Sequence, residues 1–322
     1  MNDPTDPEVV RYIWLPIKFL ENDEIALEKL SNWKLDDTII EEPVTPPEPQ
    51  EYDSIDGLSG EILYDTDGER VYACGGEVHQ FTENGETKWY WFGVDDLVTD
   101  RQKEHPGIHL YSSTDLYNWK HEGTMDEDGQ LGMVAHPKVL YNEKQHQYVM
   151  WVSNANNEAI VATSSSIKGP FTTVEGAGDG VTGFINLYQD RSGEAYLLFT
   201  GIGGLRLAKL SDDYTAIDGT PQLLEFTGNN SLYAAEGGIF ERNGKYYIVN
   251  AGSPDSFGPQ YAVADSLSGS WTLHSLQMWD DQKQSFENIV KKNQTSTALK
   301  GTFTIFYSGY ENSFDMQTVF VT

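Results

Sequence analysis

The chain has little of what would indicate metal, disulfide, membrane or nucleic-acid chemistry. Its one cysteine, Cys74, excludes an intrachain disulfide framework, and no CxxC or His/Cys cluster indicates zinc. The longest apolar runs have the length of a strand, so none predicts a transmembrane helix. Only 21 basic residues stand against 50 acidic ones in 322, a net charge of −29. This acidic protein therefore lacks the basic surface that nucleic acid or an anionic membrane requires.

What the sequence does contain is a repeated β pattern. Runs rich in Tyr, Trp, Phe and Val recur with centres near residues 90, 149, 197, 247 and 305. Turn pairs such as Asn243-Gly244 precede them, which is typical of hairpins. A second strand-like element with a Ser/Asp turn follows most runs, at 108–120, 159–172, 205–219 and 260–272.

The spacing of these runs, about 50 to 60 residues, fits four strands and their loops in each unit. Convincing helical segments are lacking between them. Five such units predict an all-β fold, a five-bladed β-propeller. An all-β sandwich with coincidental spacing is the alternative.

A proline- and glutamate-rich linker divides the chain. PVTPPEPQ at 43–50 is typical of an extended, solvated segment. We therefore expect an N-terminal segment at 1–42, the linker at 43–51 and the propeller at 52–322.

The motifs of the long body resemble glycoside hydrolase family 43, especially its exo-β-1,3-galactanase-like branch. The matching stretches keep the family's order and spacing over nearly all of residues 58–310. They are CGGEVHQF with KWYWFGVDD (74–96), YSSTDLYNWKHEG (111–123), HPKVLYNEKQHQYVMW (136–151), LYQDRSGEAYLLFT (187–200), EGGIFERNGKYYIVNAGSP (236–254) and NQTSTALKG (293–301).

The resemblance implies a five-bladed propeller with a carbohydrate pocket at its central funnel. It further implies exo-acting, inverting hydrolysis of β-1,3-galactan or a related galactose-containing polysaccharide. No redox or nucleotide cofactor and no metal is implied, and the expected partner is an oligo- or polysaccharide. Residues 1–7 do not form a signal peptide. A polysaccharide substrate nevertheless favours a secreted or cell-surface protein.

Residues 9–37 resemble the closing C-terminal segment of these same propellers, although they stand at the opposite end of the chain. Three interpretations are open. The segment is the tail of an upstream tandem copy, or it docks back and completes the last blade, as in a circular permutation. The third is an amphipathic helix at 24–30.

Two residues match the catalytic positions of the family. Inverting hydrolysis needs a general acid and a base that activates water. The resemblance assigns the acid to Glu236, although an ungapped match places Ala235 there, so an ordinary surface glutamate is the alternative. In this branch a fifth-blade glutamine or glutamate replaces the usual aspartate base, and Gln294 matches it; its amide can orient a water.

Other catalytic positions depart from the family. Ala135 stands where the second-blade motif has a glutamate, and Gly183 and Phe184 stand where an Arg-Asp pair tunes the acid. Glu77 or His136 could compensate, with a structural or solvated role as the alternative. These losses make a second hypothesis plausible, a catalytically degenerate carbohydrate-binding propeller. A third is a structural module of a tandem surface protein.

Aromatic rings can stack on the C–H face of a sugar. Trp91, Trp151 and Tyr233 lie at or near expected inner positions and are the candidate sugar platforms. Packing within the blades is the alternative for each of them.

Overall fold

Every regular element that the computed structural model describes is a β-strand. The structure describes residues 12–19, 24–27, 33–35, 63–83, 85–94, 107–125, 131–227, 237–250, 260–275, 277–278, 297–299, 302–308 and 314–320. Within these ranges no helix is long and apolar enough to cross a membrane. Residues 25–27 of the N-terminal segment form a strand, so the predicted alternative of an amphipathic helix at 24–30 is wrong there.

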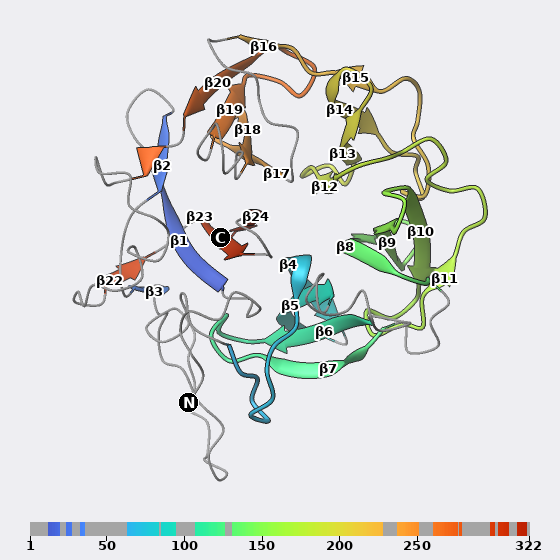
Figure 1. Cartoon of the computed structure of the whole chain (residues 1–322), viewed down its shortest axis with the longest axis vertical. Helices are drawn as coiled ribbons and strands as arrows, with labels where there is room; N and C mark the ends of the chain where they lie inside the picture. The colour runs from blue at the N-terminus through green and yellow to red at the C-terminus, as the bar shows by residue number, and fades with distance from the viewer. Residues whose placement is uncertain are drawn as a thin grey trace.

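Four sheets of consecutive antiparallel strands stand around one axis (Figure 1). The first contains β4 (Cys74–Glu83), β5 (Glu86–Val94), β6 (Ile108–Ser113) and β7 (Lys120–Thr124). The second contains β8 (Val134–Asn142), β9 (Gln147–Asn154), β10 (Ala159–Ser164) and β11 (Thr172–Thr173). The third contains β12 (Ile185–Gln189), β13 (Ala195–Gly201), β14 (Gly204–Lys209) and β15 (Gln222–Leu223). The fourth contains β17 (Gly237–Arg242), β18 (Lys245–Asn250), β19 (Gln260–Ala264) and β20 (Trp271–Ser275), with β16 (Phe226–Thr227) parallel to β20.

A fifth sheet joins the two ends of the chain. Its order is β21–β2–β1–β23–β24, from β21 (Gln277–Met278), β2 (Ile25–Leu27), β1 (Tyr12–Phe19), β23 (Thr302–Ser308) and β24 (Phe314–Phe320). A separate parallel pair joins β22 (Thr297–Leu299) to β3 (Trp33–Leu35). The structure therefore confirms an all-β propeller, with four blades of consecutive strands where the sequence predicted five.

The innermost strands contact one another in sequence, β4 with β8, β8 with β12 and β12 with β17. β24 contacts both β17 and β4. The first strand of each consecutive blade thus lines the axis, and the aromatic runs found in the sequence form the second strand.

The buried parts of the second strands β9 and β13 are largely apolar because both of their faces are covered. In β9, Val149 and Trp151 belong to the core shared with the third blade, whereas Met150 and Val152 belong to the core shared with the first. Successive side chains of a strand point to opposite faces, so an uninterrupted apolar run fits a strand covered on both sides. In β13, Leu197 and Leu198 divide between two cores in the same way.

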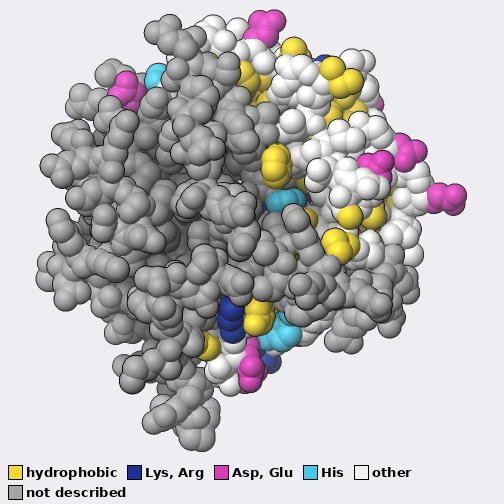
Figure 2. Space-filling model, in the orientation of Figure 1, with side chains coloured by type: hydrophobic (Ala, Val, Ile, Leu, Met, Phe, Trp, Pro, Cys, Tyr) yellow, Lys and Arg dark blue, Asp and Glu magenta, His cyan; other side chains and the backbone are white. Residues whose placement is uncertain are grey.

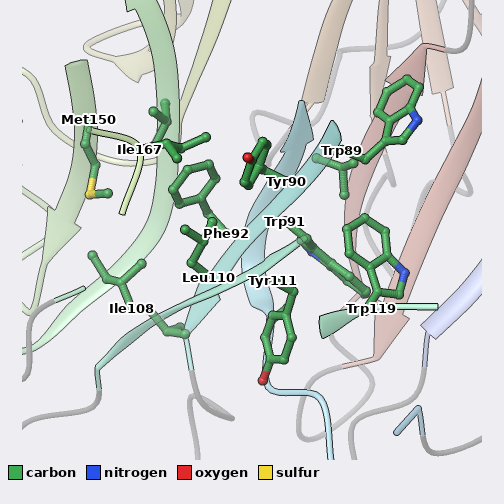
Figure 3. Packing of buried hydrophobic residues seen from close by; sticks show 14 of the residues in the cluster. Trp89, Tyr90, Trp91, Phe92, Ile108, Leu110, Tyr111, Trp119, Met150 and Ile167 are labelled. Carbon is green, nitrogen blue, oxygen red and sulfur yellow. The ribbon is translucent and has the colours of Figure 1, made fainter. Parts of the chain in front are cut away.

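The core between the first two blades is rich in aromatic rings (Figure 3). Trp91 and Trp119 meet edge to face with their ring centroids 5.1 Å apart, and both are fully buried. Met150 and Ile167 of the second blade pack in the same core.

Ser/Asp turns follow the third strands as the sequence predicted. The Asp115 carboxylate accepts the backbone N–H groups of Tyr117 and Asn118 and the hydroxyl of Ser113. Asp213 repeats the arrangement in the third blade, with Ser211 and Thr215 as donors. Such side-chain acceptors satisfy backbone donors that no strand pairs with.

Trp151 offers a test of the contact between the second and third blades. Its indole N–H donates to the Tyr214 carbonyl across the interface at 2.9 Å. Trp151→Phe removes this donor and part of a fully buried ring, so we expect a loss of about 2–4 kcal/mol in unfolding free energy. Chemical denaturation measures the loss. Leu223→Ala, at a side chain that is 41% exposed, is the control. An equal effect in both variants would contradict the packing role of Trp151.

Candidate functional site

Two matching bulges shape the beginning of the first two inner strands. In β4 the pairing with β5 jumps from Cys74 to Glu77, and in β8 the pairing with β9 jumps from Ala135 to Lys138. Each jump leaves two residues outside the ladder, Gly75 and Gly76 in β4 and His136 and Pro137 in β8. Bulges re-aim side chains and are frequent beside active sites.

The two bulges are tied together by a buried lysine. The Lys138 ammonium donates to the carbonyls of Gly75 and Gly76 at 3.1 and 2.9 Å, and the residue is only 3% exposed. Glycine is needed at both positions. A Cβ on Gly76 would lie 1.5 Å from the Phe92 carbonyl oxygen, and Gly75 has a φ of +67°. The first two blades are therefore fixed to each other at this end of the axis.

His136 lies in the second bulge, in a left-handed conformation with a φ of +57°. Its ring meets the ring of Phe184 edge to face, with centroids 5.5 Å apart. A Cβ on Gly75 would lie 2.8 Å from His136 Nδ1, so only glycine leaves room for this imidazole. Phe184, at the beginning of the third blade, is 37% exposed. Figure 2 shows a histidine beside a hydrophobic side chain near the middle of the face it displays.

Glu77 is the buried carboxylate of this region, and both of its oxygens have partners. Oε1 accepts the backbone N–H of Val139 from β8 in a short hydrogen bond. Oε2 lies 3.1 Å from Nε2 of His79, two residues further along β4. The Glu77 side chain is 7% exposed and that of His79 is 33% exposed. The carboxylate is thus held from the neighbouring blade and orients an imidazole that solvent reaches.

A cavity of about 430 Å³ begins at Glu77 and His79 and continues along the axis. Inner strands of all four consecutive blades line it, which gives it the size and position of a small-ligand pocket. Beyond Glu77 and His79, its polar residues are Gln80, Thr82, Tyr141, Glu143, Tyr148, Asn186, Tyr188 and Gln189.

Two tyrosines of this cavity, Tyr148 and Tyr188, are neutral hydrogen-bonding groups. Burial raises the pKa of Tyr148, with the nearby Glu83 charge adding to the effect. Burial likewise raises the pKa of Tyr188, beside Tyr246 and Glu241. Their hydroxyls therefore stay protonated at physiological pH. Among the described residues, no group of three or more His, Cys, Asp or Glu side chains could hold a metal ion.

The sequence-predicted residues fall into three groups. Glu77 lines the cavity, and His136 lies at the bulge beside Phe184. Trp91 and Trp151 are fully buried in blade cores, which favours the alternative of packing over the predicted role as sugar platforms. Glu236, Gln294 and Tyr233 lie outside the described residues, and their roles stay predictions.

Sequence reasoning missed His79 and Lys138. The signal for His79 was present, because Glu77 and His79 are separated by one residue on a predicted strand and must share a face. Lys138 was visible only as part of the family motif. Its contact with Gly75 depends on a bulge that no pattern of hydrophobicity marks.

Comparisons with known proteins agree with the propeller fold. The model of "Glycosyl hydrolases family 43" matches residues 83–319. A solved GH43 β-1,3-galactosidase with galactodeoxynojirimycin is 22% identical, with a TM-score of 0.58, over 80% of this chain and 97% of that one. The exo-β-1,3-galactanase of Phanerochaete chrysosporium with β-1,3-galactotriose is 24% identical, with a TM-score of 0.52, over 65% of this chain and 51% of that one. An α-L-arabinofuranosidase of Clostridium thermocellum is 19% identical, with a TM-score of 0.53, over 76% of this chain and 90% of that one. No curated protein sequence matches the chain.

Lys138 is the residue to test in this region. Lys138→Met keeps most of the side-chain volume but leaves the Gly75 and Gly76 carbonyls without their donor. We expect a loss of about 1–3 kcal/mol in unfolding free energy, measured by chemical denaturation. Lys144→Met is the control, because that ammonium is 65% exposed and lies 3.6 Å from an exposed Asp212 carboxylate. A Lys138 variant as stable as the control would contradict the role of this tie.

Proposed function

The chain belongs to glycosyl hydrolase family 43, and from this premise we propose that it is an exo-acting, inverting hydrolase of β-1,3-galactan or a related galactose-containing polysaccharide. The observation that carries the proposal is the axial cavity, which is lined by four blades and has a buried, oriented carboxylate at one end. A cavity of about 430 Å³ can accept one or two sugar rings.

The choice of galactose is supported by the branch that the motifs resemble. The solved relatives named with galactodeoxynojirimycin and β-1,3-galactotriose point the same way. An arabinofuranosidase shares the fold at a similar TM-score, so the fold alone does not determine which sugar is bound. We further propose that the protein acts at the cell surface or outside the cell, where such polysaccharides are found.

We assign the general acid to Glu236. This glutamate directly precedes β17 in the sequence, and Gly238, two residues later, lines the cavity. A protonated glutamate there can deliver its proton to the leaving oxygen while water attacks from the opposite face of the sugar. Gln294 is proposed to orient that water, and Tyr233 to contact the sugar.

Galactose release from β-1,3-galactan tests the proposal. We expect the wild-type protein to release galactose, measured by anion-exchange chromatography, and Glu236→Gln to reduce the rate by about 100-fold or more because the proton donor is lost. Glu175→Gln, in an exposed turn, is the matched control and should keep the wild-type rate.

Two other results would change the assignment. Release that survives in Glu236→Gln would remove this residue from the acid role while leaving the activity in place. No release by the wild-type protein from a panel of galactose-, arabinose- and xylose-containing glycans would contradict the proposed activity and favour a carbohydrate-binding propeller.

The fifth sheet is proposed to act as the fifth blade, closed by the N-terminal segment. β1 pairs with β23 through a register from Tyr12 with Tyr307 to Pro16 with Phe303. β24, on the other side of β23, contacts the inner strands of the first and fourth blades. Such closure between the two ends of a chain removes exposed strand edges. It supports docking of residues 9–36 onto the same propeller over membership of an upstream copy.

Deletion of residues 1–36 tests this closure. Loss of β1 and β2 would expose the edge of β23, so we expect a midpoint of thermal unfolding lower by about 5 °C or more and concentration-dependent aggregation. Calorimetry and light scattering measure the two effects. Deletion of residues 1–8 alone is the control. An unchanged midpoint in the longer deletion would favour the tandem interpretation.

A further inference from the structure

The cavity holds a pair of residues to which the family assignment gives no role, Glu77 and His79. Both are on β4, where their spacing of two places them on the same face. They approach through Glu77 Oε2 and His79 Nε2 at 3.1 Å. Both residues line the cavity, so the pair lies where a bound sugar would meet the protein.

The position of the carboxylate is fixed by the second blade. The Val139 N–H donates to Glu77 Oε1, and the imidazole faces Oε2. An ionised carboxylate accepts hydrogen bonds and donates none. The His79 nitrogen facing it must therefore carry the proton, which sets the neutral ring as the Nε2–H tautomer. Nδ1 is then the ring nitrogen with a lone pair available to a ligand.

We propose that His79 is the catalytic proton acceptor of this site and that Glu77 is its positioning residue. The inference rests on the proposed function. In the step, the oxygen of a water bonds to the anomeric carbon and the glycosidic C–O bond breaks. His79 Nδ1 takes the proton that the water loses, and the leaving oxygen receives a proton from the general acid. The protonated His79 then gives its proton to solvent and the acid takes one up from solvent, so each turnover consumes one water and restores both groups.

A histidine base would supply a proton acceptor that the matching motif does not provide. The resemblance places Gln294 where the family usually has an aspartate base, and an amide is a poor proton acceptor. A carboxylate that orients a histidine and stabilises its protonated form is a general way to build a base. The proposed water-orienting role of Gln294 is compatible with it, because an amide positions a water without taking its proton.

Kinetics of His79 variants test the role of the base. We expect His79→Gln to lower kcat by about 100-fold or more, with KM within about threefold of the wild-type value. Added imidazole should restore part of the rate in His79→Ala, which a purely structural role would not allow. His146→Gln, at an exposed turn, is the matched control. A wild-type kcat in His79→Gln would overturn the proposal.

Glu77→Gln tests the positioning role through the tautomer. In glutamine an NH2 group takes the place of one carboxylate oxygen, so Val139 N–H and His79 Nε2–H can no longer each face an acceptor oxygen. We expect two-bond ¹H–¹⁵N spectra of the ¹⁵N-labelled protein to show the Nε2–H tautomer of His79 in the wild type and its loss in Glu77→Gln. An Nδ1–H tautomer in the wild type would overturn the arrangement.

Sugar release by the wild-type protein tests the proposed function, and the rate of His79→Gln tests the role of His79 as the proton acceptor. A wild-type protein that releases no sugar would contradict the proposed function and, with it, the proton-accepting step. A wild-type protein that releases galactose while His79→Gln keeps the full rate would leave the function standing and overturn the inference alone.

Discussion

The structure depends on the burial of both faces of the second strands, shown by β9 and β13. Because Val149 and Met150 belong to different cores, β9 belongs equally to the blade before it and the blade after it. Both faces of such a blade are apolar, so a neighbouring blade has to cover each of them. This requirement arranges the sheets around an axis, brings their first strands together and creates the space that the cavity occupies.

The site is built where this regular packing is interrupted. At the two bulges, four residues are not paired in the β-ladder: Gly75, Gly76, His136 and Pro137. The Lys138 ammonium donates hydrogen bonds to the glycine carbonyls in place of the ladder. The same interruption turns His136 toward Phe184 and brings the Val139 N–H to Glu77. Packing and chemistry therefore share residues here. A substitution meant to alter one is expected to alter the other, so stability has to be measured beside activity.

Much of the fold could be predicted because its signals are local. The strands at 86–94, 147–154, 195–201, 245–250 and 302–308 coincide with the aromatic runs, and Asn243 has the positive φ of the expected turn. The fifth sheet could not be predicted with the same certainty, because it joins residues about 290 positions apart, such as Tyr12 and Tyr307. A pairing of that range has no local pattern, and only the resemblance of residues 9–37 to a closing segment pointed to it.

The site was less predictable than the fold for a related reason. Burial of Trp91 and Trp151 follows from the packing of whole sheets, and strand position alone does not separate a core ring from a ring at the axis.

The net charge of the chain limits which polymers can approach it. A chain with a net charge of −29 repels anionic polymers, so a neutral polysaccharide can approach it more readily than a sulfated or uronic one. Inside the cavity, Asn186 and the neutral Tyr188 provide hydrogen-bond donors and acceptors for an uncharged ligand.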